Sequence, residues 1–211
     1  MHGKVDLMEA KGFASLRPYD GPEIPASEWE SLEFVPWNSS GAEDFAPIAS
    51  AKGELECGGF WDFGKPDKDG VWTANAERCP SLVRWVEEVG ARYGRVRVIK
   101  LPPTVDRAEQ LLHLDDNNRL NPEGEGWVVR AWLELTDNPN SYMIVRDKKD
   151  DPSTESRIYL GKGAQYVVDS ERLYHAGSHT GPHTRYALIA SFESGPELER
   201  WMEARLPEPI R

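Results

Sequence analysis

The second half of the chain constrains the fold most, because it reads as a succession of short strands with no long helical pattern between them. These segments combine apolar and polar alternation with many β-branched and aromatic residues, which is typical of strands. The expected strands span residues 95–101, 126–135, 141–147, 157–160, 164–169 and 184–193. Several short strands at regular spacing predict an all-β core, an antiparallel jelly roll or barrel.

The first part of the chain has a different character. Proline and glycine interrupt residues 18–69 so often that long elements have little room. We expect short strands, turns and one brief helix near residues 27–32, with Ser27 as its N-cap.

Two further helices are expected on either side of the strand-rich core. Residues 80–93 carry apolar residues at helical spacing, and Gly94 ends this amphipathic helix. A last helix follows Ser194, which caps it, with Pro196 in the first turn. We therefore predict an α+β chain in one structural domain, with an N-terminal mixed extension (1–94), an all-β core (95–193) and a C-terminal helix and tail (194–211).

Composition narrows the function classes. The 211 residues carry a formal net charge of −11, which disfavours binding to nucleic acid. No stretch approaches the roughly 18 apolar residues of a membrane span, and the first residues lack a secretion signal. The two cysteines, Cys57 and Cys79, do not make a disulfide framework, so we expect both to be reduced. These features predict a cytoplasmic protein, and the sequence carries no signal for an oligomeric state.

Histidines provide the strongest chemical signal. His113 and Asp115 stand two residues apart, so in an extended segment both side chains point the same way. With a histidine from a distant strand they would form the ligand set that holds ferrous iron on one face. His175 is the preferred partner, because a strand-like pair precedes it, whereas Gly181 and Pro182 place the rivals, His179 and His183, on a turn.

Two arginines are expected to point into the core. Arg185 alternates in phase with small and apolar residues of the last strand, so its side chain points inward and needs an anion. Arg130 shares a face with Val128 and Trp132, which makes it a second inward candidate for binding a carboxylate of a ligand.

The stretch from about residue 95 to residue 193 resembles the iron(II)/2-oxoglutarate-dependent oxygenases, and within them the aspartyl/asparaginyl β-hydroxylase-like group. His113-Leu-Asp115 matches the first motif, and Arg130-Ala-Trp132 matches the second, with Trp132 where the family often has histidine. Residues 160–169 resemble the glycine turn and the strand that precede the distal histidine.

The last motif is the longest match. His175 and Arg185 keep the separation that the family shows between its distal histidine and its arginine, while His179 stands where the family has asparagine. The resemblance covers about half of the chain, and the first 90 residues carry none of it.

This resemblance implies a double-stranded β-helix, also described as cupin-like, and a dioxygenase. It implies that His113, Asp115 and His175 hold Fe(II), that 2-oxoglutarate chelates the iron and that O2 is the further co-reactant. Arg185 would bind the far carboxylate of 2-oxoglutarate through its guanidinium fork. Trp132 and Arg130 would lie beside the cosubstrate. A carboxylate at position 115 favours hydroxylation or desaturation over halogenation, because halogenating relatives have a small uncharged residue there.

A small, amino-acid-like or carboxylate-bearing molecule is the expected substrate of this hydroxylase, with Asn118, Arg119 and His179 as candidates for recognising it. Two alternatives stand beside this hypothesis. One is a cupin-like metal- or ligand-binding protein that does not turn over 2-oxoglutarate. The other is an oxygenase that acts on Asp or Asn of a peptide.

Overall fold

The computed structural model of the protein describes residues 11–36, 43–103, 108–121 and 126–207. Its strands are β1 (Phe13–Leu16), β2 (Val35–Pro36), β3 (Asp44–Ser50), β4 (Val71–Trp72), β5 (Tyr93–Leu101), β6 (Val128–Glu134), β7 (Ser141–Arg146), β8 (Glu155–Tyr159), β9 (Gln165–Val168), β10 (Tyr174–His179) and β11 (Arg185–Glu193). Its α-helices are α1 (Ser27–Glu30), α2 (Pro80–Glu88) and α3 (Pro196–Glu203). Short 3-10 helices are η1 (Phe60–Phe63), η2 (Ala76–Arg78), η3 (Ala108–Leu111) and η5 (Pro152–Thr154).

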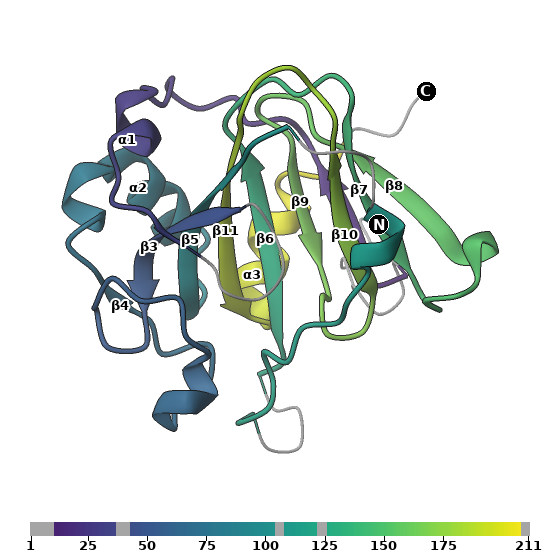
Figure 1. Ribbon diagram of the computed structural model, residues 1–211. Coiled ribbons are helices and arrows are strands. Elements are labelled where there is room, and N and C mark those ends of the chain that lie inside the picture. The colour runs from purple at the N-terminus through teal and green to yellow at the C-terminus, as the bar shows by residue number, and fades with distance from the viewer. Residues whose placement is uncertain (1–10, 37–42, 104–107, 122–125, 208–211) are drawn as a thin grey trace.

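The described strands form two antiparallel sheets. The larger sheet has eight strands in the order β1-β9-β6-β11-β5-β3-β2, with β4 paired to β3, and the smaller sheet has the order β10-β7-β8. Figure 1 shows the smaller sheet on one side of the larger one, while α2 and α3 lie toward the other side. The predicted all-β core with flanking helices is confirmed. Strands from the first 94 residues, β1 to β4, belong to the same large sheet.

Two apolar layers hold these elements together. Between the helices and the large sheet, Trp85 of α2 packs against Phe192 of β11 and against Trp201 of α3. Between the two sheets, Ile189 of β11 and Met143 of β7 belong to a second cluster. Strands such as β11 are therefore buried on both faces, which explains their nearly continuous apolar sequence.

The helix boundaries differ from those predicted. Helix α2 ends at Glu88, because Gly90 adopts a left-handed φ of 75° and the chain turns into β5 before Gly94. Helix α3 begins at Pro196 with Gly195, not Ser194, at its N-cap position. In α1 the predicted cap, Ser27, is the first helical residue, and Ala26 precedes it without a side-chain cap.

The sequence prediction contained only the start of strand β10: it read Leu173 and Tyr174 as strand and wrongly placed His179 on a turn, whereas β10 continues to His179. Its residues pair in register with β7, from Tyr174 opposite Arg146 to His179 opposite Ser141. Gly177 and three serine or histidine positions give this segment no apolar alternation, so pairing with β7 decides its conformation.

The cysteines and the helices bear on the environment expected for the chain. Cys57 and Cys79 are both free, as the reduced state requires. None of the helices in the described residues has the length and apolar character to cross a membrane.

Candidate metal centre

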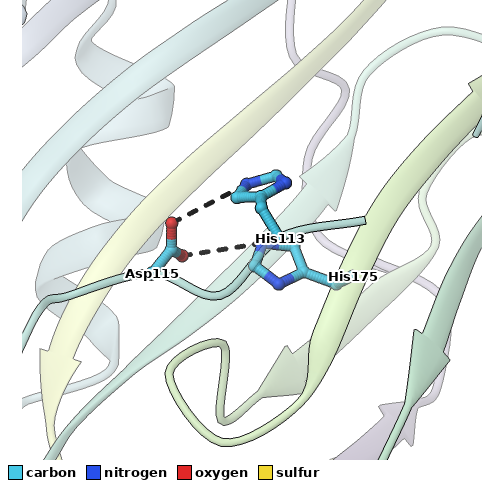
Figure 2. Close-up of side chains that lie close together, drawn as sticks. All are labelled: His113, Asp115 and His175. Carbon is cyan, nitrogen blue, oxygen red and sulfur yellow. Dashed lines mark ion pairs between the residues drawn. The ribbon is translucent and has the colours of Figure 1, made fainter. Parts of the chain in front are cut away.

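The structure brings His113, Asp115 and His175 together, and one ligand atom from each lies within 4.8 Å of the others. Backbone pairing causes this: His113 and His175 exchange two backbone hydrogen bonds of 3.2 and 3.0 Å, which sets their rings side by side. The Asp115 amide then donates to the Ser170 carbonyl, so the extended segment carries the carboxylate to the same side. Figure 2 shows both imidazole rings facing the two oxygens of Asp115.

The donor set suits a divalent cation. Nδ1 of His113 lies 2.9 Å from the Leu111 carbonyl, and Nδ1 of His175 lies 3.1 Å from the Leu173 carbonyl. Because a carbonyl only accepts, both Nδ1 atoms carry the proton and both Nε2 atoms present a lone pair. These lone pairs face Asp115 at 3.9 and 3.6 Å. Lone pairs aimed at a carboxylate repel it, and a cation between them removes the repulsion.

The charge states at neutral pH agree with a ligand role. Burial lowers the pKa of His175 to about 4, so its ring is neutral. Burial alone would raise the pKa of Asp115, but the positive charge of Arg130 opposes it, and the pKa of this carboxyl stays below its ordinary value. Nη1 of Arg130 lies 2.9 Å from Asp115 Oδ2, and its Nη2 donates to Asn117 Oδ1 at 2.8 Å.

Strand β6 places three functional side chains on the face that looks toward the smaller sheet. Arg130 lies at the metal end, Trp132 is next, and Glu134 lies at the other end. The Trp132 ring stacks on Tyr166 of β9 and meets the His175 ring edge to face at 6.4 Å. The inward direction predicted for Arg130 and Trp132 is thus what the structure shows.

Arg185 also points inward, as predicted, and its anion belongs to the protein itself. Glu134 accepts hydrogen bonds of 2.9 Å from Arg185 Nε and 2.6 Å from Arg185 Nη2, and a third of 2.9 Å from the Tyr166 hydroxyl. All three residues are buried. Burial lowers the pKa of Arg185, but Glu134 outweighs this effect and raises it above its ordinary value. The role of Arg185 toward 2-oxoglutarate stays a prediction.

Glu134 was missed by the sequence analysis, and so were two arginines of β5. Arg95 and Arg97 point to the inner face, while Val96 and Val98, which alternate with them, face the helices. Each of the three residues is a charged residue at an inward-facing position of a strand, and this pattern in the sequence could have identified them.

Asn118 lies in a network inside the protein. Its side chain bonds to both backbone groups of Val128, to the Glu171 carboxylate and to Asn121, at distances of 2.7 to 3.0 Å. Arg119 is exposed instead, and its guanidinium lies 4.0 Å from the centre of the Trp61 ring. Their proposed roles in substrate recognition stay predictions, and the contacts of Asn118 point to holding the metal-binding loop against β6.

Replacing Asn118 with alanine is expected to lower the free energy of unfolding by roughly 2–3 kcal/mol, because several buried polar groups lose their partner. Urea denaturation of both proteins measures this. Arg119→Ala is the control, with an expected loss below about 1 kcal/mol for an exposed cation over a ring. Wild-type stability in Asn118→Ala would contradict the structural role.

His179 lies further along β10 than His175. Its Nε2 donates to the His183 carbonyl at 2.7 Å, so its Nδ1 accepts from the Ser141 hydroxyl at 2.6 Å. Both ring nitrogens are engaged within the protein, and the ring is buried. The histidine that the structure brings to His113 and Asp115 is therefore His175, and the predicted role of His179 in substrate binding stays a prediction.

Solved structures with a similar fold are known. An oxidoreductase of the 2OG-Fe(II) oxygenase family from Burkholderia pseudomallei has a TM-score of 0.59 and 11% identity, covering 89% of this chain and 87% of that one. A prolyl hydroxylase from Trichoplax adhaerens, in complex with a hypoxia inducible factor peptide, has a TM-score of 0.52 and 13% identity, with coverage of 91% and 88%. A Pseudomonas putida prolyl-4-hydroxylase has a TM-score of 0.51 and 14% identity, with coverage of 92% and 98%.

The fold is the double-stranded β-helix. It is the fold of 2-oxoglutarate- and Fe(II)-dependent oxygenases, as the sequence resemblance implied. At this level of identity the likeness shows the fold alone, and the assignment to the aspartyl/asparaginyl β-hydroxylase-like group stays a prediction. No protein-family model matches the chain, and no curated protein sequence matches it.

Proposed function

We propose that the protein is an Fe(II)- and 2-oxoglutarate-dependent dioxygenase that hydroxylates an unactivated C–H bond of a small substrate. The observation that carries this proposal is the convergence of two imidazole lone pairs and one carboxylate, from His113, His175 and Asp115, inside a double-stranded β-helix. Two histidines and one carboxylate are the ligand set of non-haem iron oxygenases, which leave positions open for other ligands.

In this proposal the chain's own residues bind, orient and exclude water. His113 and His175 hold iron through Nε2, because the Leu111 and Leu173 carbonyls fix the proton on Nδ1. Arg130 fixes the orientation of Asp115 from the protein side. Bound iron supplies the activation of O2 that breaks an unactivated C–H bond.

The interior also favours an acidic cosubstrate and substrate. A buried arginine of the barrel interior would bind the far carboxylate of 2-oxoglutarate, and a neighbouring cation would bind a carboxylate of an amino-acid-like substrate. Trp132 and Tyr166 are buried in the apolar cluster between the two sheets, and such side chains would keep water from the reacting atoms.

Succinate formation tests the function. The protein is loaded with Fe(II) without oxygen, supplied with 2-oxoglutarate and then exposed to air while succinate is measured over time. The proposal expects succinate from the wild type and none from Asp115→Ala. Absence of succinate together with no binding of 2-oxoglutarate to the Fe(II)-loaded wild type would contradict it.

One observation favours the alternative of a metal-binding protein without turnover of 2-oxoglutarate. Arg185, the arginine that the resemblance gives for the distal carboxylate, is already paired with Glu134. In that case metal binds at His113, Asp115 and His175, but calorimetry detects no binding of 2-oxoglutarate. The same succinate and binding measurements therefore separate the two functions.

A further inference from the structure

The guanidinium group of Arg185 is already hydrogen-bonded within the protein. Glu134 binds it through two hydrogen bonds, and Tyr166 donates a third to the same carboxylate. A carboxylate of 2-oxoglutarate at Arg185 would displace Glu134 and leave a charged side chain buried without its cation, which is strongly unfavourable. The cosubstrate therefore needs another cation.

A second group of arginines lies at the metal end of the interior: Arg95, Arg97 and Arg130, which we call the arginine cluster. In the large sheet, Arg97 of β5 pairs with Ile189 of β11, and Ile189 pairs with Trp132 of β6. Arg97 thus lies in the same row as Trp132, whose ring meets the ring of the metal ligand His175. The cluster and the metal ligands share one end of the barrel interior.

The arginine cluster concentrates positive charge. Arg95 lies 3.7 Å from Asp67, and Arg130 lies 2.9 Å from Asp115, so two carboxylates meet three guanidinium groups. Asp115 also belongs to the candidate metal site, where a bound dication would add further positive charge. Burial and the charges of Arg95 and Arg130 lower the pKa of Arg97 to about 9. An incoming anion would relieve this repulsion.

The guanidinium group of Arg97 also has a fixed orientation. Its guanidinium lies over the Phe45 ring, 4.0 Å from the ring centre, which fixes the orientation of the planar group. Only 6% of the residue is exposed, so water competes little and a hydrogen bond to an anion is strong there.

We propose that Arg97, supported by Arg95, binds the distal carboxylate of 2-oxoglutarate, while Arg185 serves the buried pair with Glu134. This inference rests on the proposed function, because it requires 2-oxoglutarate at the metal. Arg97 is therefore a cosubstrate-binding residue that the motif resemblance does not indicate.

The test is calorimetric titration of the protein loaded with Fe(II) in the absence of oxygen. Two ligands are compared: 2-oxoglutarate, and pyruvate, which has the same 2-oxo acid group without a distal carboxylate. Arg97→Gln is expected to weaken binding of 2-oxoglutarate roughly 10- to 100-fold and to leave the affinity for pyruvate unchanged. Arg97→Lys keeps the charge and is expected to lose less.

The matched control removes the competing arginine without leaving a buried charge. In the double variant Glu134→Met, Arg185→Met, binding of 2-oxoglutarate is expected to equal that of the wild type. Weaker binding in this variant with unchanged binding in Arg97→Gln would overturn the assignment to Arg97 and leave the proposed function intact. No binding of 2-oxoglutarate to the Fe(II)-loaded wild type would overturn both. Circular dichroism and the bound iron content of each variant show that the fold and the metal site are kept.

Discussion

Replacing His175 with alanine is expected to abolish tight binding of Fe(II) and all formation of succinate. The variant loses one of three protein ligands, and its place on β10 is filled by no other metal ligand, because both nitrogens of the nearby His179 are already bonded within the protein. The apo protein is expected to stay folded, since the backbone hydrogen bonds between positions 113 and 175 are kept and the His175 Nε2 lone pair faces a carboxylate without a stabilising contact. Anaerobic calorimetry with Fe(II), together with circular dichroism, measures both effects.

His183→Ala is the matched control for this prediction. His183 is exposed and contributes only its backbone carbonyl to the hydrogen bond with His179, so the substitution removes a histidine and keeps that contact. Iron affinity and succinate formation are expected to match the wild type. If His183→Ala lost iron and His175→Ala retained it, the ligand assignment would be wrong.

Replacing Glu134 with alanine is expected to lower the free energy of unfolding by roughly 3–5 kcal/mol. The buried Arg185 guanidinium would lose both hydrogen bonds to its carboxylate partner, and the Tyr166 hydroxyl would lose its acceptor. Chemical denaturation followed by tryptophan fluorescence measures the change in unfolding free energy.

Two comparisons separate a buried pair from ordinary ion pairing. The double variant Glu134→Met, Arg185→Met removes both charges and is expected to recover most of the loss, since apolar side chains of similar volume replace buried pairs well. Glu197→Ala breaks an exposed pair with Arg200 on α3 and is expected to leave the stability nearly unchanged. A loss below about 1 kcal/mol in Glu134→Ala would show that Arg185 does not depend on this carboxylate.

Much of the architecture could be predicted because alternation in strands survives in the sequence. Six expected strands appear as β5, β6, β7, β8, β9 and β11, and their ends shift by only a few residues. The grouping of the candidate metal ligands was predictable for a related reason. In an extended segment His113 and Asp115 share a face, and the spacing of His175 and Arg185 gave the second half of the motif.

The parts that were missed depend on contacts between distant segments. Strand β10 has no apolar alternation, and its pairing with β7 appears only in the folded chain. Arg97 was not singled out, because its neighbours Val96 and Val98 face the helices and the burial of the other face of β5 becomes visible only in the folded chain. The sequence analysis expected a ligand carboxylate to pair with Arg185. The partner in the structure is Glu134, which lies 51 residues away in the sequence, so no local pattern connects the two.

Anomalous diffraction from crystals of the protein soaked with Mn(II) tests the central claim most directly, because it locates the metal without relying on turnover. The account predicts one strong peak between the Nε2 atoms of His113 and His175 and the carboxylate of Asp115, and no peak at that position in Asp115→Ala crystals. A metal bound elsewhere, or an empty site in wild-type crystals at saturating Mn(II), would contradict it.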